Sequence, residues 1–364
     1  KKKNQKTIYT QKMKKEVRGG MSGGLDSAVT ALLLKKQGDE VVGVFFALSG
    51  ADESVAERQA ADLAQKLDIK FEVYDGRELF QKNVLTKLLS AYEKGMTPNP
   101  CILCNPSVKF KLLFFLAEQK AIPYVATGHY ARIVEEESGP AIARGVDEKK
   151  DQSYMLYRLP REWLSSIVFP LGDLRKEEVR EIAKSFLPEW VVQKKESQDV
   201  CFAPEGLDDF LNFHLSDKKT CQPGSIMDES GKEIGTHNGL WRYTIGQRKG
   251  LGLPGGPWFV VSKNIVHNIL RVSRKKELSS LRIWCEAPVM YRYLTEGAFY
   301  MAEHRYRTRP FSVMIESVTE QAMVVRGVEI CPVVAPGQSL VLYNKDVVCG
   351  GGIIISSEEV SPCQ

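Results

Sequence analysis

Residues 19–34 read Gly-Gly-Met-Ser-Gly-Gly-Leu-Asp-Ser-Ala-Val-Thr-Ala-Leu-Leu-Leu, a glycine-rich loop that runs directly into an apolar segment. Glycine has no Cβ, so backbone N–H groups in such a loop can turn toward a ligand. The apolar segment predicts a helix, whose first N–H groups and partial positive charge favour a bound anion. The stretch therefore predicts a phosphate-binding loop at a helix N-terminus. The alternative is an ordinary glycine turn in which Asp26 and Ser27 cap the helix.

The spacing of this loop differs from two common nucleotide motifs. It has neither the Lys-Ser/Thr pair of a Walker loop nor the Gly-x-Gly-x-x-Gly order of dinucleotide-binding folds. Residues 22–27 instead resemble the SGGxDS loop of the ATP pyrophosphatases, enzymes that cleave ATP between the α and β phosphates and adenylate a substrate. The resemblance implies ATP as the cofactor, with Mg²⁺ beside it. Asp26 is the single Mg²⁺ ligand that the loop suggests.

Strand-like and helix-like segments alternate from the loop to about residue 205. Apolar runs at 41–46, 70–74 and 122–127 predict strands, and helical spacing covers 28–38, 53–67, 79–94 and 110–120. This alternation predicts an α/β fold with a Rossmann-like parallel sheet and helices on both faces. Residues 16–18 hold a single good strand residue, so the strand before the loop is the weakest element. Since ligands bind beyond the carboxyl ends of such strands, we expect the loop, Phe46 and Gly128 around one pocket.

The character of the sequence changes beyond about residue 205. Short segments punctuated by Gly and Pro follow, and from residue 281 short alternating runs with recurring turn signals predict a small antiparallel β-barrel. A chain of 364 residues is too long for one core. We predict four regions: a basic tail over 1–18, an ATP-binding catalytic domain over 19–205, a small central domain over 206–280 and the β-barrel domain over 281–364.

Composition restricts the class of protein. Hydrophobic content of 43% and charged content of 26% are typical of a globular chain. No apolar run reaches the ~18 residues that span a bilayer, and the basic N-terminus lacks the apolar region of a secretory signal. The eight cysteines are too sparse for a disulfide scaffold. These features predict a cytoplasmic protein with no membrane partner, and a net charge of +5 argues only weakly for nucleic acid.

Three of the cysteines lie in segments that could carry chemistry. Residues 97–105 read Thr-Pro-Asn-Pro-Cys-Ile-Leu-Cys-Asn, which predicts a proline-stiffened loop, and Cys201 follows a polar, acidic stretch. An iron–sulfur cluster held by Cys101, Cys104 and Cys201 would be one ligand short of the usual four. A thioredoxin-like redox pair is disfavoured because Cys101 and Cys104 are not expected to open a helix in the usual strand–helix context. Catalytic sulfurs that carry and resolve a persulfide are the third interpretation, and spacing alone does not choose among them.

Motifs along nearly the whole chain resemble the tRNA-specific 2-thiouridylase family. They occupy residues 20–27, 99–105, 126–132, 150–154, 196–202, 243–252, 305–307, 336–338 and 349–354. The resemblance implies 2-thiolation of the wobble uridine in the tRNAs for Lys, Glu and Gln. It implies that ATP adenylates O2 of the uridine and that a persulfide sulfur then displaces AMP. The implied partners are the tRNA anticodon arm and a persulfide-donating sulfur carrier or cysteine desulfurase, and the central domain would bind tRNA.

The resemblance also implies roles for single residues. Cys201 matches the family's persulfide-carrying cysteine, and Cys104 matches the cysteine called its nucleophile. Nucleotide contacts fall on Gly20, Met21, Ser22, Gly23, Gly24, Leu25, Asp26, Ser27, Phe46 and Gly128. Contacts with the target base and the tRNA fall on Asn99, Pro100, Cys101, His129, Lys150, Asp151, Gln152, Arg305, Tyr306 and Gln338.

Departures from the family pattern leave alternatives open. Cys101 stands where some members carry Asp, Phe46 stands where Met is common, and the segment 47–54 is shorter than usual. Three neighbouring thiols keep the iron–sulfur cluster as a less favoured alternative. A non-catalytic RNA-binding protein with a structural metal does not account for the glycine loop. An ATP pyrophosphatase with a small-molecule substrate does not account for the RNA-facing motifs of the C-terminal half.

Overall fold

The computed structural model describes residues 15–49, 53–194, 200–203, 205–274, 277–278, 281–329 and 331–360. These residues form two compact units. Unit 1 is built from the described parts of 1–84, 101–202 and 346–348, and unit 2 from those of 85–100, 203–345 and 349–364. The chain therefore passes between the units several times.

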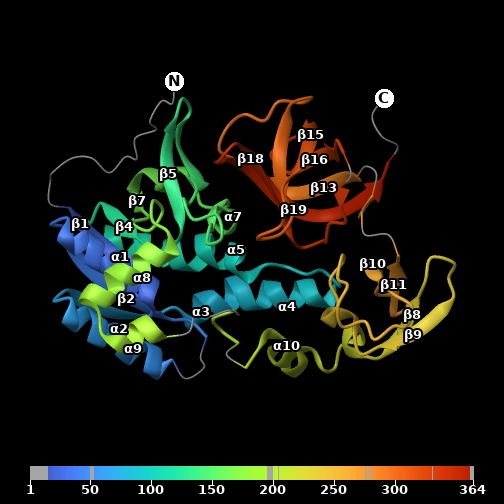
Figure 1. The fold of residues 1–364 in the computed structure, drawn as a ribbon, viewed down its shortest axis with the longest axis horizontal. Helices are drawn as coiled ribbons and strands as arrows, with labels where there is room; N and C mark the ends of the chain where they lie inside the picture. Colours follow the sequence, from blue (N-terminus) through green and yellow to red (C-terminus); the bar gives the residue numbers. More distant parts are fainter. Residues whose placement is uncertain are drawn as a thin grey trace. The chain divides into compact units, whose positions relative to one another are not determined.

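A five-stranded parallel sheet is the framework of unit 1 (Figure 1). Its strands are β1 (Glu16–Gly20), β2 (Glu40–Ala47), β3 (Lys70–Asp75), β4 (Tyr124–Ala126) and β7 (Ile167–Val168). They follow the order β3-β2-β1-β4-β7, and every pairing is parallel. The predicted Rossmann-like parallel sheet is confirmed.

The remaining elements of unit 1 cover this sheet or extend from it. They are α1 (Leu25–Lys36), α2 (Ser54–Lys66), α3 (Arg77–Phe80), the π-helical turn η1 (Gln81–Leu85), α5 (Pro100–Cys104), the π-helical turn η2 (Asn105–Lys109), α6 (Phe110–Glu118), α7 (Ser153–Leu156), the 3₁₀ turn η3 (Arg161–Ser166), α8 (Lys176–Phe186), α9 (Glu189–Gln193) and the hairpin of β5 (Ala131–Glu136) and β6 (Gly139–Arg144). Helix α1 contacts β1 and β2, and α6 contacts β1 and β4. The boundaries of the predicted helices and strands shift by a few residues.

Strand β1, the weakest expectation, lies at the centre of the sheet. It pairs with β2 on one side and β4 on the other, so its backbone hydrogen bonds are satisfied despite a poor strand sequence. Val17 is fully buried in the core, and the buried Arg18 pairs with Glu72. Tertiary pairing therefore outweighs local propensity at this strand.

One helical stretch of unit 1 is unusually apolar. The continuous run Pro100–Glu118, made of α5, η2 and α6, has the length and hydropathy of a membrane span. More than half of it is buried inside the protein, and Phe110 and Leu113 have almost no exposed surface. Burial of this kind is characteristic of a core helix.

Unit 2 holds a small sheet and a β-barrel. The first part contains α4 (Thr86–Glu93), α10 (Leu207–Leu215), the 3₁₀ turns η4 (Lys219–Cys221) and η5 (Leu240–Arg242), and the strands β8 (Gly224–Met227), β9 (Glu233–His237), β10 (Phe259–Asn264) and β11 (Ile269–Ser273). The strand order is β10-β11-β8-β9, over a core that includes Ile226, Val260 and Leu270.

The barrel is antiparallel, as predicted. Its strands are β13 (Leu281–Met290), β14 (Phe299–Glu303), β15 (Phe311–Val318), β16 (Ala322–Gly327), β18 (Ser339–Asn344) and β19 (Val347–Glu359), with a short pair of β12 (Glu277–Leu278) and β17 (Cys331–Pro332). The order β13-β16-β15-β14-β18-β19 is closed by pairing of β13 with β19. Alternate residues such as Leu281, Ile283 and Cys285 fill the interior, which is the period-two pattern that the sequence showed.

Candidate active site

The glycine loop joins β1 to α1 at the carboxyl end of the central strand. Gly24 is the N-cap of α1, and no side chain caps the helix with a hydrogen bond. The Ser27 hydroxyl donates to the Gly24 carbonyl at 2.9 Å and accepts from the Ser22 N–H at 3.2 Å. The interpretation of Asp26 and Ser27 as an ordinary cap was wrong, because Ser27 braces the loop and Asp26 points to other partners. The first N–H groups of α1 thus have no side-chain cap among the described residues.

Two glycines let neighbouring backbones approach this loop. Gly23 has a φ of 69°, and a Cβ there would lie 2.6 Å from the carbonyl oxygen of Ala56. A Cβ on Gly128, in the segment after β4, would lie 3.0 Å from the carbonyl carbon of Asp26. Because β1 and β4 are parallel neighbours, the segments that follow them meet beyond the carboxyl ends of the strands. Ligands of α/β folds bind at this position. The structure thus brings the loop and Gly128 together, as the sequence predicts.

The Asp26 carboxylate is held by two side chains from distant parts of the chain. Lys176 Nζ lies 2.7 Å and 2.8 Å from its two oxygens, and the Tyr130 hydroxyl donates to it at 2.8 Å. Lys176 is almost fully buried, whereas the Asp26 side chain is 36% exposed. Sequence reasoning missed Lys176 and Tyr130, because no local pattern marks a contact across 150 residues.

A second lysine, Lys194, also contacts the glycine loop, although it lies 171 residues after Gly23 in the sequence. Lys194 Nζ donates to the Gly23 carbonyl at 3.0 Å and to the Gln59 side chain at 2.6 Å. Burial lowers the pKa of Lys194 below its usual value. Two ammonium groups therefore contact this loop. The charge of Lys176 is balanced by Asp26, whereas Lys194 donates to neutral oxygens and so favours a phosphate group beside the loop. Nothing in the sequence near Lys194 marked it as a site residue.

The paired cysteines lie on a helix rather than in a loop. Residues 100–104 form α5, with Pro100 at its start, so the predicted proline-stiffened loop was wrong. Proline fits the first helical position because its missing N–H is not needed there. Cys101 and Cys104 do lie in a helix, but α5 follows α4 and not a strand, so the strand–helix context of a thioredoxin-like redox pair is absent. The Asn105 side chain fixes the next turn by donating to the Met155 carbonyl at 2.9 Å.

All three candidate cysteines are free thiols in different surroundings. Cys104 is buried, Cys101 is half-buried and Cys201 is exposed. Burial raises the pKa of Cys104 to about 12 and also raises the pKa of Cys101. Cys201 precedes Phe202, whose buried ring packs on Phe80 with centroids 5.6 Å apart and so anchors this segment in unit 1.

Lys109 is the charged group that these three thiols share. It lies in the π-helical turn η2, and its ammonium interacts electrostatically with Cys101, Cys104 and Cys201. Burial opposes the charge on Lys109, but the thiolates together outweigh burial and raise its pKa. The same attraction counteracts the effect of burial on the pKa of Cys104. Sequence reasoning missed Lys109, although its position five residues after Cys104 in an apolar stretch was a usable signal.

The thiols are not arranged as a metal site. Within the part of the chain that the structure describes, no group of three or more His, Cys, Asp or Glu side chains could hold a metal ion. The iron–sulfur cluster through Cys101, Cys104 and Cys201 therefore receives no support from the geometry.

His129 is enclosed by aromatic rings next to this region. Its ring stacks on Phe110 and meets Phe169 edge-on, and its Nδ1 hydrogen-bonds to the Thr127 hydroxyl at 2.7 Å. Burial, with a smaller effect of the Lys109 charge, lowers the pKa of His129 to about 3. His129 is therefore neutral at physiological pH, and any contact it makes with tRNA would be made by an uncharged ring. Phe46 lies half-buried near the carboxyl end of β2.

Two of the predicted tRNA contacts are engaged inside unit 1. The buried Asp151 accepts from Arg144 at 3.0 Å, from the Gly145 N–H at 3.0 Å and from the Ser153 hydroxyl at 2.8 Å. The side-chain oxygen of Gln152 accepts from the Tyr130 N–H at 3.0 Å. These contacts give both residues a structural role, and a contact with tRNA stays a prediction for them and for Lys150.

The remaining predicted contacts belong to unit 2. The buried Gln338 donates its side-chain amide to the Thr97 carbonyl, and the Thr97 N–H donates to the Pro336 carbonyl at 2.9 Å. Asn99 and Pro100 follow this anchored segment. Arg305 and Tyr306 lie in the turn between β14 and β15, with Arg305 exposed, and their contact with tRNA stays a prediction.

Comparison with known domain families divides the chain into three matched regions. Residues 15–205 match a family described as the tRNA methyl transferase HUP domain. Residues 208–274 match the tRNA methyl transferase PRC-barrel domain, and residues 283–354 match the aminomethyltransferase beta-barrel domain.

Curated relatives match over almost their entire length. The tRNA-specific 2-thiouridylase MnmA of Helicobacter hepaticus is 39% identical over 344 residues, covering 93% of this chain and 98% of the relative. That of Clostridioides difficile is 38% identical over 361 residues, covering 95% and 99% respectively. That of Clostridium perfringens is 38% identical over 357 residues, covering 94% and 99%.

Proposed function

The chain belongs to the tRNA-specific 2-thiouridylase family, and on that premise we propose that it is an ATP-dependent tRNA-uridine 2-sulfurtransferase. The proposed reaction replaces O2 of the wobble uridine in the tRNAs for Lys, Glu and Gln by sulfur. One observation carries the proposal beyond family membership. Cys104 and Cys201, almost a hundred residues apart in sequence, both lie within electrostatic reach of one ammonium group, that of Lys109.

The first step is adenylation of the uridine. O2 attacks the α-phosphate of ATP, the bond to the β-phosphate breaks and pyrophosphate leaves. The N–H groups at the start of α1, together with Lys194, are suited to stabilise the negative charge that develops on phosphate oxygens. The nucleotide contacts are proposed for residues 20–27, Phe46 and Gly128.

Mg²⁺ is proposed to accompany ATP. Asp26 is the one carboxylate within the predicted phosphate-binding loop, residues 20–27. Its two oxygens already contact Lys176 and Tyr130. A metal ion would therefore have to share Asp26 with an ammonium, which disfavours direct coordination. We propose that Asp26 orients the loop and that ATP brings most of the metal's ligands.

The second step transfers sulfur. A persulfide on Cys201 attacks C2 of the adenylated uridine with its terminal sulfur, and AMP leaves with the C2–O2 electron pair. Cys104 then attacks the Cys201 sulfur, so that a Cys104–Cys201 disulfide forms and the electron pair of the broken S–S bond stays on the sulfur of 2-thiouridine. An external dithiol reductant restores both thiols. Lys109 stabilises the Cys104 thiolate that this step requires, against the burial that disfavours it.

The wider assignments are part of the same proposal. The tRNA anticodon arm would contact the segment Asn99, Pro100 and Cys101 together with the other predicted positions, and a persulfide-donating carrier or desulfurase would load Cys201. The exposure of Cys201 supports the loading step, because a donor protein must reach the thiol. The cytoplasm is the proposed location, and the four regions that end at 18, 205, 280 and 364 stay a prediction.

The test measures 2-thiouridine in tRNA transcripts after incubation with the enzyme, ATP and a persulfide donor. We expect Cys104→Ser and Cys201→Ser each to lower the amount of 2-thiouridine by at least a hundredfold. A serine hydroxyl can neither carry a persulfide, as Cys201 does, nor attack a disulfide, as Cys104 does. Cys221→Ser is the matched control, since Cys221 lies in unit 2 and takes no part in the scheme. In the Cys104→Ser variant the radiolabelled sulfur should stay bonded to Cys201 and to C2 of the uridine, because no thiol breaks the S–S bond between them. Full thiolation by either of the first two variants would refute the sulfur assignments.

A further inference from the structure

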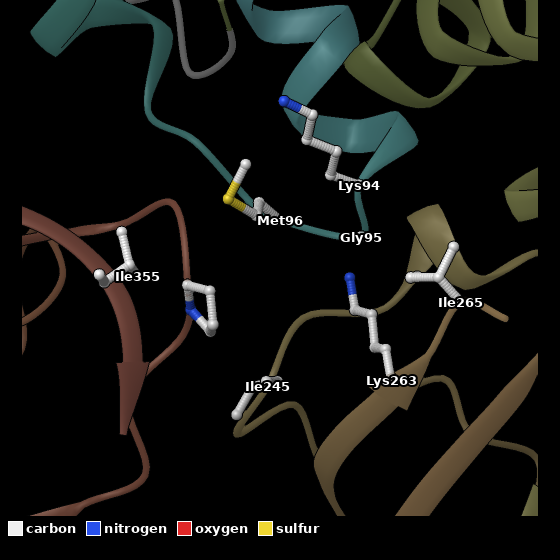
Figure 2. Close-up of a pocket in the computed structure, with 8 residues that line it drawn as sticks. Lys94, Gly95, Met96, Ile245, Lys263, Ile265 and Ile355 are labelled. Carbon is white, nitrogen blue, oxygen red and sulfur yellow. The ribbon is translucent and has the colours of Figure 1, made fainter. Parts of the chain in front are cut away.

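Unit 2 contains a cavity of about 300 Å³ that the proposed chemistry does not use (Figure 2). Its apolar walls and its two lysines come from separate segments: Met96 and Lys94 after α4, Lys263 on β10, and Ile245, Ile265 and Ile355. A volume of this size lies at the lower end of the range for small-ligand pockets. No acidic side chain lines the cavity among the described residues.

Lys263 is the unusual group in this cavity. Its side chain extends from β10 toward the Gly95 segment (Figure 2), and its Nζ is buried without a hydrogen-bond partner among the described residues. Burial lowers the pKa of Lys263 to about 8, so the group still carries its charge at neutral pH. A buried ammonium without a partner is costly, and native proteins usually satisfy such a group with a ligand, water or a counter-charge.

Glu93, the acidic residue next to the cavity residue Lys94, does not supply a counter-charge for Lys263. Glu93, directly before Lys94, is paired with Lys218 at 3.0 Å. Lys94 itself is exposed and adds a second positive charge to the lining. The cavity is therefore positively charged within apolar walls, an arrangement that attracts an anion.

The cavity is also preformed. Gly95 has a φ of 73°, a backbone conformation that favours glycine, and the position of a Cβ there is taken up by the Ile265 side chain. The next residues are held by the hydrogen bond between the Thr97 N–H and the Pro336 carbonyl and by the close contact of Gly337 with Met96. A ligand would enter without ordering this backbone wall first, and the Lys263 side chain would turn its buried Nζ toward the ligand.

We propose that this cavity is an anion site that accepts a phosphate group of the bound tRNA, with the Lys263 ammonium as its charged anchor. The choice of tRNA as the source of the phosphate rests on the proposed function. A lysine suits this task because its ammonium acts as a point charge on a phosphate oxygen. The isoleucine and methionine walls exclude water from the contact and pack against the carbon atoms of the adjoining ribose. Free inorganic phosphate offers the same chemistry, and the experiment separates the two sources.

The first measurement is the affinity of full-length protein for unmodified tRNA at a series of salt concentrations. Each phosphate contact contributes about 1 to the slope of log K against log salt. We expect Lys263→Met to reduce that slope by about 1 and to weaken binding up to about tenfold at low salt. Lys263→Arg should retain most of the slope. Lys232→Met, which removes an exposed lysine from the β8–β9 turn, is the matched control and should have a smaller effect.

The second measurement is thermal stability with and without inorganic phosphate, which needs neither tRNA nor activity. Because Lys263 is unpartnered, Lys263→Met should unfold at the same temperature as wild type or higher. If phosphate raises the unfolding temperature of wild type but not of Lys263→Met, while the salt slope for tRNA is unchanged by the variant, the site binds free phosphate and its assignment to tRNA is overturned. If neither the slope nor the phosphate response depends on Lys263, the anion site itself is refuted. If the wild-type protein does not thiolate tRNA, but phosphate still raises its unfolding temperature through Lys263, then the proposed function fails and the anion site stands.

Discussion

Asp26 and Lys176 form an ion pair whose two partners differ in burial. The Lys176 side chain is 4% exposed, whereas the Asp26 side chain is 36% exposed and also accepts from Tyr130. An isolated charge is far more costly inside a protein than at its surface. The pair is therefore asymmetric: the lysine depends on the aspartate more than the aspartate depends on the lysine.

This asymmetry predicts different costs for the two truncations. Asp26→Ala removes the carboxylate that contacts a buried ammonium at 2.7 Å and 2.8 Å, and should lower the free energy of unfolding by about 3 kcal/mol. Lys176→Met leaves a carboxylate that water and the Tyr130 hydroxyl can still solvate, so the loss should be about 1 kcal/mol. Urea denaturation of both variants measures the difference. Equal losses, or a larger loss for Lys176→Met, would contradict this account of the pair.

At the residue scale, the sequence showed the groups that chemistry needs but not their neighbours. The glycine loop and the cysteines carry local motifs, so they were found. Lys176 and Lys194 sit among ordinary charged residues late in unit 1, and only the fold brings them to the loop. Asp151 and Gln338 match the family motif, yet their burial and hydrogen bonds depend on segments that no local pattern specifies.

The turn from β1 into α1 is the element that most constrains substitution. Gly23 lies in the left-handed region and contacts the backbone of α2, so it must satisfy two conditions at once. Gly38, after α1, has a φ of 91° but nothing within 4 Å of the position of a Cβ. The two glycines therefore separate the cost of backbone conformation from the cost of a close approach.

We expect Gly23→Ala to be much more harmful than Gly38→Ala. The Gly38 variant should lose about 1 kcal/mol, the conformational cost of alanine in the left-handed region. The Gly23 variant pays that cost and also forces the Ala56 carbonyl away from a Cβ at 2.6 Å, so it should lose about 3 kcal/mol or more and weaken ATP binding. Thermal unfolding with and without ATP gives both quantities. A Gly23 variant no worse than the control would show that α2 yields easily.

At the element scale, periodicity predicted strands and helices well where one face is buried. One weakly indicated element was confirmed and one prediction was wrong, and both outcomes have physical causes. Residues 16–18 form a strand because neighbours on both sides supply its hydrogen bonds, which propensity does not register. Residues 100–104 form a helix because Pro100 occupies a helix start, where proline is favoured, although prolines in sequence usually indicate a loop.

The whole molecule is not a simple succession of folding units. Unit 1 lies mostly before residue 203 but includes residues 346–348. Unit 2 lies mostly after residue 202 but includes residues 85–100. Val347 pairs with Ala143 of β6, and α4 contacts α10 and η4. The sequence predicted the parallel sheet and the barrel correctly. It could not predict this exchange of segments, because no change of composition marks residues 85 or 346.

A fragment ending at residue 205 should therefore be incomplete. It keeps α4 but removes α10 and η4, so the buried Leu88 and Tyr92 of α4 lose their cover. We expect trypsin to cleave the fragment at Lys87 much faster than the full chain, by a factor of about 10 or more. Lys111 on α6 is the internal control, since its helix keeps its neighbours β1 and β4. Equal protection of Lys87 in both proteins would show that α4 is stable without unit 2.

The hydrogen bond from Gln338 to Thr97 has a consequence for the order of events during synthesis. Its partners are 241 residues apart, and a ribosome adding roughly 5–20 residues per second needs about 12–48 s to make the intervening chain. During that interval Cys101 and Cys104 have left the ribosome while the segment before them still lacks its anchor. The nascent protein therefore passes through a period in which Cys101 and Cys104 exist while the residues directly before them are not yet anchored.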